Sequence, residues 1–209
     1  MNASVDIGVS IFSFLIGSIP TAFLLVRQHS GKDLRMEGSG NIGALNAFEV
    51  SRSKRVGALV LAIDLIKGLA PVLLVHLFIG DDLIAGSLAL VCVVAGHNFS
   101  PWIGFKGGRG LASAAGAFIL YDPYFLVLWG IVWLIVFMVR RNVHVGNIAA
   151  TVLAPLIGWC FPSIAVRCSA FACANVVYLI TATVLLFTLI FIKHVEPLRN
   201  LVKPKNPQQ

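Results

Sequence analysis

The chain has 209 residues, of which 58% are hydrophobic and only 12% are charged. Soluble domains carry about 25% charged residues, so too few polar side chains remain here to cover a water-soluble globule. This composition excludes a soluble enzyme, a disordered chain and a secreted disulfide scaffold, and it predicts an all-α polytopic membrane protein. The formal net charge is +7, from 16 lysines and arginines against 9 acidic residues.

Seven apolar runs follow one another along the chain. They cover residues 7–26, 56–79, 83–99, 110–120, 123–139, 147–160 and 168–192. A helix needs about 20 apolar residues to cross a bilayer, and irregular backbone cannot face lipid, so each run is predicted to be helical. The runs 110–120 and 147–160 are short, and they fit either thin or tilted spans or half-membrane hairpin arms. We expect one domain over residues 1–209, ending in a loose cytoplasmic tail at 198–209.

The cations between these runs are concentrated in alternate loops. They occupy the loops at 27–55 and 100–109, the pair at 140–141 and the C-terminal tail. The turns at 80–82 and 122 have none, and the segment 161–169 has only Arg167. The positive-inside rule then predicts seven crossings, with the N-terminus outside and the C-terminus in the cytoplasm. Treating both short runs as hairpin arms would leave five crossings and place residues 140–141 outside, against the rule.

The first cationic loop contains the sequence G-S-G-N-I-G at residues 38–43. Its G-x-G-x-x-G form matches a dinucleotide fingerprint, but that motif needs a preceding strand and a βαβ unit, which the apolar pattern excludes. Clustered glycines instead let successive N–H groups point into one concavity that suits phosphate oxygens. Ser39 and Asn41 would add side-chain donors. An ordinary flexible loop is the alternative interpretation.

The second loop reads F-K-G-G-R-G at residues 105–110, directly before an apolar run. A helix N-terminus that follows glycines and is flanked by Lys106 and Arg109 favours an anion. The alternative is an ordinary turn whose cations only keep this loop in the cytoplasm. That would explain the cations but not the density of glycine. His97 lies just upstream. It is either a packed interfacial histidine or, beside an anion site, a candidate catalytic residue.

Asp64 and Lys67 are three residues apart inside the second apolar run. Charges at membrane depth are costly and indicate function by default. At this spacing the two side chains share a helix face and can neutralise each other, which is the structural alternative. Either way the pair faces the protein interior.

His76 and Asp81 have H-x4-D spacing, but the topology places them at the outer end, and we interpret that spacing as chance.

Two anion-binding loops at one membrane face indicate a reaction between two phosphorylated substrates, one of them a lipid. The sequence contains no serine-hydrolase, zinc-protease or Walker A motif, so covalent and metal catalysis lose support. Acyl transfer by positioning and charge stabilisation fits better. We expect no cofactor, no metal and no nucleic-acid partner.

These motifs resemble those of the bacterial acyl-phosphate:glycerol-3-phosphate acyltransferase family. The likeness covers G-S-I-P-T-A at 17–22, G-S-G-N-I-G-A-x-N at 38–46, D-x-x-K-G at 64–68, G-H-N-F at 96–99, F-K-G-G-R-G-x-A-S at 105–113 and H-V-E at 194–196. The resemblance implies a seven-helix enzyme of the bacterial inner membrane, with its N-terminus outside and its active face in the cytoplasm. It also implies acylation of the 1-hydroxyl of glycerol 3-phosphate by acyl phosphate, which yields lysophosphatidic acid for phospholipid biosynthesis.

The resemblance further implies that the two glycine-rich loops hold the phosphates and that no covalent acyl-enzyme forms. A phosphate oxygen, His97 or His194 would accept the proton. The residues expected to bind substrate are Ser39, Gly40, Asn41, Gly43, Asn46, Asp64, Lys67, Lys106, Gly107, Gly108, Arg109 and Glu196. The expected partners are acyl phosphate, glycerol 3-phosphate and membrane lipids, and the expected state is a monomer.

The chain departs from the family pattern at several positions. Leu45 replaces a threonine, Glu49 an arginine that binds substrate phosphate and Arg109 a lysine, while His144 and Asn147 stand where serines are usual and Pro197 replaces an asparagine. Arginine in place of lysine keeps the charge but not the geometry. The alternative function is a transporter or scramblase of a phosphorylated metabolite or lipid on the same fold. A structural membrane subunit is a third interpretation.

Overall fold

The computed structural model describes residues 3–173 and 175–202, and within these ranges all named elements are helices. They are α1 (Ala3–Ser18), α2 (Thr21–Ser30), α3 (Ala44–Ser51), α4 (Lys54–Phe78), α5 (Leu83–Asn98), the 3-10 turn η1 (Pro101–Ile103), α6 (Leu111–Tyr121), α7 (Pro123–Arg140), α8 (Val143–Gly158), α9 (Pro162–Cys168), α10 (Val176–Ile192) and α11 (Val195–Val202). The prediction of an all-α protein is confirmed. Residues 198–202 of the predicted tail lie in α11, and residues 203–209 lie outside the described residues.

Several helices are long and apolar enough to cross a membrane. By length and composition, four stretches qualify: Ala3–Ser30, Lys54–Phe78, Leu83–Ile103 and Pro123–Arg140. A fifth is obtained if α8 and α9, which are bent by 98° from each other, count as one broken span. The helices α6 and α10 are apolar but shorter. The two short runs of the sequence correspond to α6 and α8.

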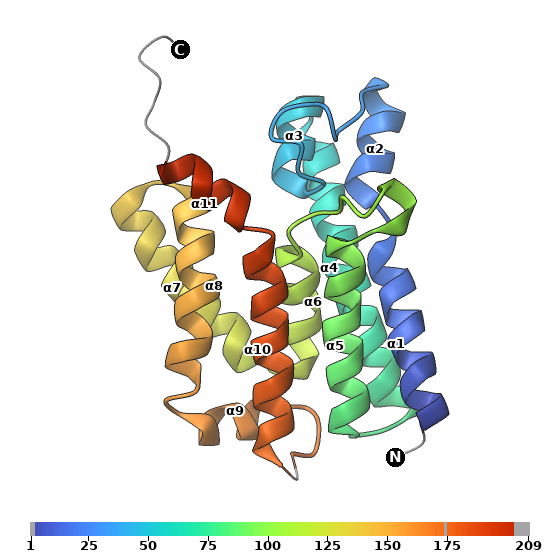
Figure 1. The fold of residues 1–209 in the computed structure, drawn as a ribbon, viewed down its shortest axis with the longest axis vertical. Coiled ribbons are helices and arrows are strands. Elements are labelled where there is room, and N and C mark those ends of the chain that lie inside the picture. Colours follow the sequence, from blue (N-terminus) through green and yellow to red (C-terminus); the bar gives the residue numbers. More distant parts are fainter. Residues whose placement is uncertain (1–2, 174, 203–209) are drawn as a thin grey trace.

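The main helices run side by side and place the polar loops at one end of the bundle (Figure 1). The turns after α4, α6 and α8 lie at the same end as the N-terminus. The loop between α2 and α3, the loop between α5 and α6, and α11 gather at the opposite end. α6 lies between a group containing α1, α4 and α5 and a group containing α7, α8 and α10. The glycine-rich loop that precedes α6 therefore stands at the centre of the polar end.

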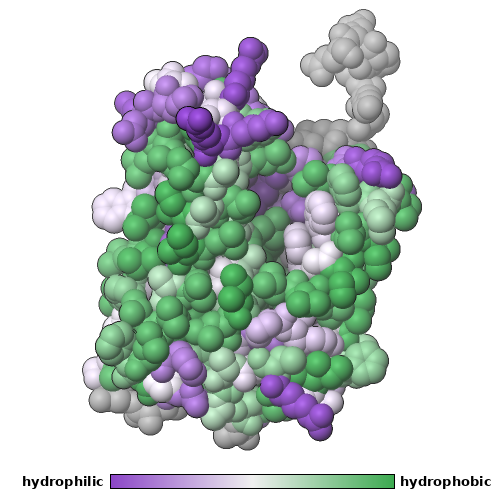
Figure 2. Space-filling model, turned by 180° about the vertical axis from the view of Figure 1, so that it is seen from behind, coloured by the Kyte–Doolittle hydropathy of each residue, from purple (hydrophilic) through white to green (hydrophobic). Residues whose placement is uncertain are grey.

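The outer surface is apolar, as contact with lipid requires. Figure 2 shows hydrophobic residues over most of one face, and hydrophilic residues at one end, in smaller groups at the other end and inside a hollow. α7 is an example, because Phe125 and Val132 are the residues of this helix that are buried. Ile131, Leu134 and Met138 on the same helix are each at least half exposed. A soluble protein would not leave such a continuous apolar helix face uncovered.

The first apolar run, predicted as a single helix, is broken next to Pro20. Proline has no N–H and disfavours the helical conformation in the residue before it, so α1 ends at Ser18. The carbonyl groups freed at the break find donors elsewhere in the fold. Lys67 Nζ donates to the Ile19 oxygen at 2.9 Å, and Ser100 Oγ donates to the Ser18 oxygen. The break thus anchors both α4 and the start of the 99–110 loop.

Glycines allow α4 and α6 to approach each other with backbones in contact. A Cβ atom on Gly68 would lie 2.0 Å from the Ser113 backbone oxygen, and one on Gly116 would lie 1.9 Å from the Leu65 oxygen. Small residues at these crossings are typical of membrane helix pairs. The contact brings the charged segment 64–67 of α4 against the first turns of α6.

Candidate functional site

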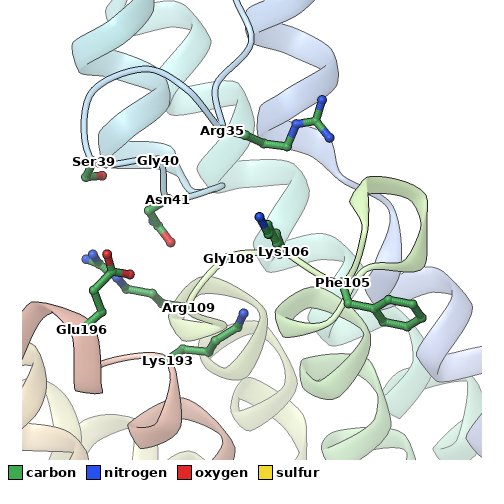
Figure 3. A pocket seen from close by; sticks show the side chains of 11 residues that line it. Arg35, Ser39, Gly40, Asn41, Phe105, Lys106, Gly108, Arg109, Lys193 and Glu196 are labelled. Atoms are coloured by element: carbon green, nitrogen blue, oxygen red, sulfur yellow. The ribbon is translucent and has the colours of Figure 1, made fainter.

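A polar cavity of about 470 Å³ opens where the two glycine-rich loops meet the end of α10 and the start of α11. Figure 3 shows its lining residues around the opening. Of the residues predicted to bind substrate, the lining includes Ser39, Gly40, Asn41, Lys106, Gly107, Gly108, Arg109 and Glu196. The structure therefore brings together the two loops and the H-V-E segment, which are distant in the sequence.

This polar cavity is strongly cationic. Among the described residues that line it, the cations are Arg35, Lys106, Arg109 and Lys193, and the carboxylate is that of Glu196. Burial lowers the pKa of Arg109 and that of Lys193, and the charge of Glu196 opposes the shift in both cases. Charge-assisted hydrogen bonds from such groups suit phosphate oxygens. A phosphate bound here would meet donors from three separate segments of the chain.

The first loop owes its shape to Asn46, at the start of α3. The Asn46 side chain is buried, and its Oδ1 accepts from the Ser39 backbone N–H at 3.0 Å. Its Nδ2 donates to the Glu37 oxygen at 3.2 Å and to the Asn41 oxygen at 3.0 Å. All three bonds run to the backbone of the loop. Asn46 therefore holds the loop from behind, while Ser39 and Asn41 line the polar cavity.

The second loop packs directly against His97 and against the first loop. The Gly108 N–H donates to the His97 backbone oxygen at 3.1 Å. A Cβ atom on Gly108 would lie 2.2 Å from His97 Nε2 and 2.4 Å from the Ile42 oxygen. No side chain fits at this position. This three-way contact requires glycine at position 108, which a topological signal alone does not explain.

A buried cluster lies beneath the loops. Lys67 Nζ is 2.9 Å from Asp64 Oδ1, so the ion pair expected from the spacing is present, and both side chains are buried. His97 Nδ1 lies 3.2 Å from Ser113 Oγ and 3.9 Å from Asp64 Oδ1. The Lys67 ammonium also donates to the Ile19 oxygen, so its bonds join α4 to the break between α1 and α2.

A second cavity of about 310 Å³ adjoins the polar one. Asn41 and Arg109 line both cavities, and His97, Asp64, Gly43, His144 and Asn147 line only the second. The remaining wall is apolar, with Leu65 and Leu111 inside and Leu45 and Leu61 near the surface, each of the latter two 46% exposed. The second cavity is thus polar at Arg109 and apolar toward the flank of the bundle.

His194 is enclosed between α10 and α11 and lines neither cavity. Its Nδ1 lies 2.8 Å from the Ile190 oxygen and therefore carries the donated proton, whereas its buried Nε2 has no partner among the described residues. Burial lowers the pKa of His194 to about 4, against the opposing effect of the Ile190 bond. The ring is neutral at neutral pH, so its unpartnered nitrogen is a proton acceptor.

This shift predicts that the fold loses stability in acid. Between pH 6.5 and about 4 the unfolded chain binds a proton at His194 that the folded chain does not, so stability falls as the pH falls. The full effect is about 3 kcal/mol. We expect the thermal unfolding midpoint in detergent to drop more steeply from pH 7 to pH 4.5 in the wild type than in His194→Asn. Parallel curves for the two proteins would contradict this.

Sequence patterns missed Arg35, Phe105 and Lys193, which also line the polar cavity. Arg35 lies in the cationic 27–55 loop and Lys193 directly after an apolar run, and cations are expected at both places for topology alone. Lys193 precedes His194 directly, and that neighbour was the signal available.

His76 and Asp81 do pair, with Nδ1 and Oδ1 3.1 Å apart, but at the end of the bundle away from both cavities.

Comparison with known proteins places these features in context. The family model described as glycerol-3-phosphate acyltransferase matches residues 7–204. The glycerol-3-phosphate acyltransferase of Desulforamulus reducens is 41% identical over 148 residues, covering 71% of this chain and 73% of its own length. That of Ehrlichia canis is 30% identical over 197 residues, covering 94% and 95%. The crystal structure of PlsY (YgiH), an integral membrane glycerol 3-phosphate acyltransferase, in its glycerol 3-phosphate form has a TM-score of 0.78 and 29% identity, with 94% of this chain and 92% of that chain covered.

Proposed function

The chain belongs to the glycerol-3-phosphate acyltransferase family, and from this premise we propose that it takes a fatty acyl group from acyl phosphate and transfers it to the 1-hydroxyl of glycerol 3-phosphate. It is a membrane acyltransferase that serves phospholipid biosynthesis. The pair of adjoining cavities that share Arg109 is the observation that supports acyl phosphate as the acyl donor. A reaction between two phosphorylated substrates needs two anion sites in contact.

The two cavities differ in the substrate that they suit. The polar cavity, lined by Lys106 and Lys193, fits glycerol 3-phosphate, which is small and has no apolar part. The second cavity has a polar end at Arg109 and a leucine wall toward the lipid-facing flank, which fits an acyl phosphate with its chain directed outward. In this arrangement the acceptor hydroxyl meets the acyl carbonyl beside Arg109.

The reaction proceeds by one displacement. The 1-hydroxyl oxygen forms a bond to the acyl carbon, the bond from that carbon to the phosphate oxygen breaks, and inorganic phosphate leaves. We assign the hydroxyl proton to a phosphate oxygen or to His97, which lines the second cavity. His194 lines neither cavity, which disfavours it as the acceptor. The protein contributes positioning and positive charge for the departing phosphate.

We further propose seven crossings, an N-terminus outside the cytoplasm and an active face inside it, in a monomer of the bacterial inner membrane. Two observations support the orientation. The termini of the described chain lie at opposite ends of the bundle, and the cation-rich loops share the end that carries both cavities. The positive-inside rule assigns that end to the cytoplasm.

The defining assay supplies purified protein in lipid with palmitoyl phosphate and glycerol 3-phosphate. We expect lysophosphatidic acid and inorganic phosphate in equal amounts, and no product when acyl-coenzyme A replaces the acyl phosphate. Absence of lysophosphatidic acid with every acyl chain length would overturn the assigned donor. Uptake of labelled glycerol 3-phosphate into sealed vesicles, without acyl product, would instead indicate the transporter alternative.

A further inference from the structure

Arg109 occupies the boundary between the two cavities, with a hydrogen-bond partner on one side and an acidic residue on the other. On the side of the second cavity, Arg109 Nη1 lies 3.3 Å from Nδ1 of His144, in the first turn of α8. On the side of the polar cavity, Glu196 of α11 attracts the same charge. The position of the Arg109 side chain therefore depends on the balance between the attraction of His144 and that of Glu196.

The Arg109 bond fixes the tautomer of His144. A guanidinium has only N–H donors, so Nδ1 of His144 must accept, and the proton of the neutral ring sits on Nε2. The backbone of His144 is held at the start of α8, because its N–H donates to the capping Asn142 Oδ1 at 2.9 Å. His144 therefore presents its acceptor to Arg109 from a capped helix terminus.

We propose, on the basis of the proposed function, that His144 is a positioning residue that holds the Arg109 guanidinium at the boundary where it reaches the phosphates of both substrates. The guanidinium has five N–H donors in a planar fork, so a bond to His144 leaves others for phosphate oxygens. Without His144, the remaining attraction of Glu196 draws Arg109 into the polar cavity and away from the acyl phosphate. His144 thus acts through Arg109 and not on the reacting atoms.

Two substitutions separate this role from simple packing. His144→Leu removes the acceptor, whereas His144→Asn keeps one, because its Oδ1 occupies nearly the position of Nδ1. Misplacement of a catalytic group by about 1 Å can cost 100-fold in rate. We expect kcat/KM for acyl phosphate to fall about 10- to 100-fold in His144→Leu and to recover most of that loss in His144→Asn. In an Arg109→Ala background, His144→Leu should have no further effect.

The pH profile gives an independent readout. A protonated His144 cannot accept from Arg109 and repels it, so wild-type activity should fall at acid pH more than that of His144→Asn. The other titratable or charged groups that face His144 or share its cavity are Arg109, Glu49 of α3, His194, His97 of α5 and Asp64 of α4. They are present in both proteins, so the difference between the two profiles belongs to His144.

The outcomes are distinguishable. A wild type that forms no lysophosphatidic acid from acyl phosphate would overturn the proposed function itself. An active wild type with equal kcat/KM in His144→Leu, or with equal losses in His144→Leu and His144→Asn, would overturn only the positioning role. Unfolding midpoints of the variants within a few degrees of the wild type confirm that the comparison is made on folded protein.

Discussion

Arg109→Ala is expected to lower kcat/KM by about 100- to 1000-fold, the range found when a donor to developing negative charge is removed from an active site. Arg109 is one of two residues that line both cavities, and it is the cationic one. Under the proposed function, its loss removes positive charge where the phosphate leaves. The measurement is phosphate release at varied concentrations of both substrates.

The matched control is Arg140→Ala. Arg140 is an exposed arginine at the end of α7, so its loss changes the net charge equally without touching either cavity. We expect wild-type kinetics for this variant, and partial activity for Arg109→Lys, which keeps the charge but loses the fork of donors. Near-wild-type activity in Arg109→Ala would mean that the two cavities do not share a catalytic cation.

Gly108→Ala is expected to reduce activity about 100-fold or more, because the 105–110 loop must move to accept one methyl group. The new Cβ would lie 2.2 Å from His97 Nε2 and 2.4 Å from the Ile42 oxygen, and neither belongs to a flexible side-chain end. A shift of the loop displaces Lys106 and Arg109 together. Steady-state kinetics, together with the unfolding midpoint, would measure the effect.

Gly130→Ala provides the comparison, because a Cβ atom on this helical glycine of α7 meets nothing within 4 Å. The same substitution should leave activity unchanged there and slightly stabilise the helix. If Gly108→Ala kept full activity, the loop would have to tolerate the displacement, and the close packing against His97 would carry no catalytic consequence.

The apolar helices were predictable because lipid imposes a length and an apolar composition on every span, whereas α3 and α11 lie outside the predicted apolar runs. The break at Pro20 was hidden by the continuous hydropathy around it, although proline itself was the signal. Only the tertiary fold shows how the break is stabilised, since Lys67 and Ser100, which donate to the freed carbonyl groups, are more than 40 residues away in sequence.

That the two glycine-rich loops contribute to one cavity was predictable, because both combine clustered glycines with nearby cations and lie in the cation-rich loops. The different roles of the residues within these loops were not predictable. Asn46 belongs to the same motif as Ser39, yet its side chain binds the backbone of the loop and lines neither cavity. Lys193 follows the end of α10 and His144 lies in α8, and no local pattern relates them to Arg109.

The leucines at the mouth of the second cavity bear on how the enzyme meets its donor. Leu45 and Leu61 are each 46% exposed at the edge of the second cavity, so under the proposed function an acyl phosphate dissolved in the bilayer can reach the cavity sideways without entering water. Glycerol 3-phosphate arrives from the aqueous side. The acyl phosphate then diffuses to the enzyme within the plane of the membrane, whereas glycerol 3-phosphate diffuses to it through the aqueous solution. The mole fraction of donor in the membrane, and not its amount per volume of solution, sets the rate at which the second cavity fills.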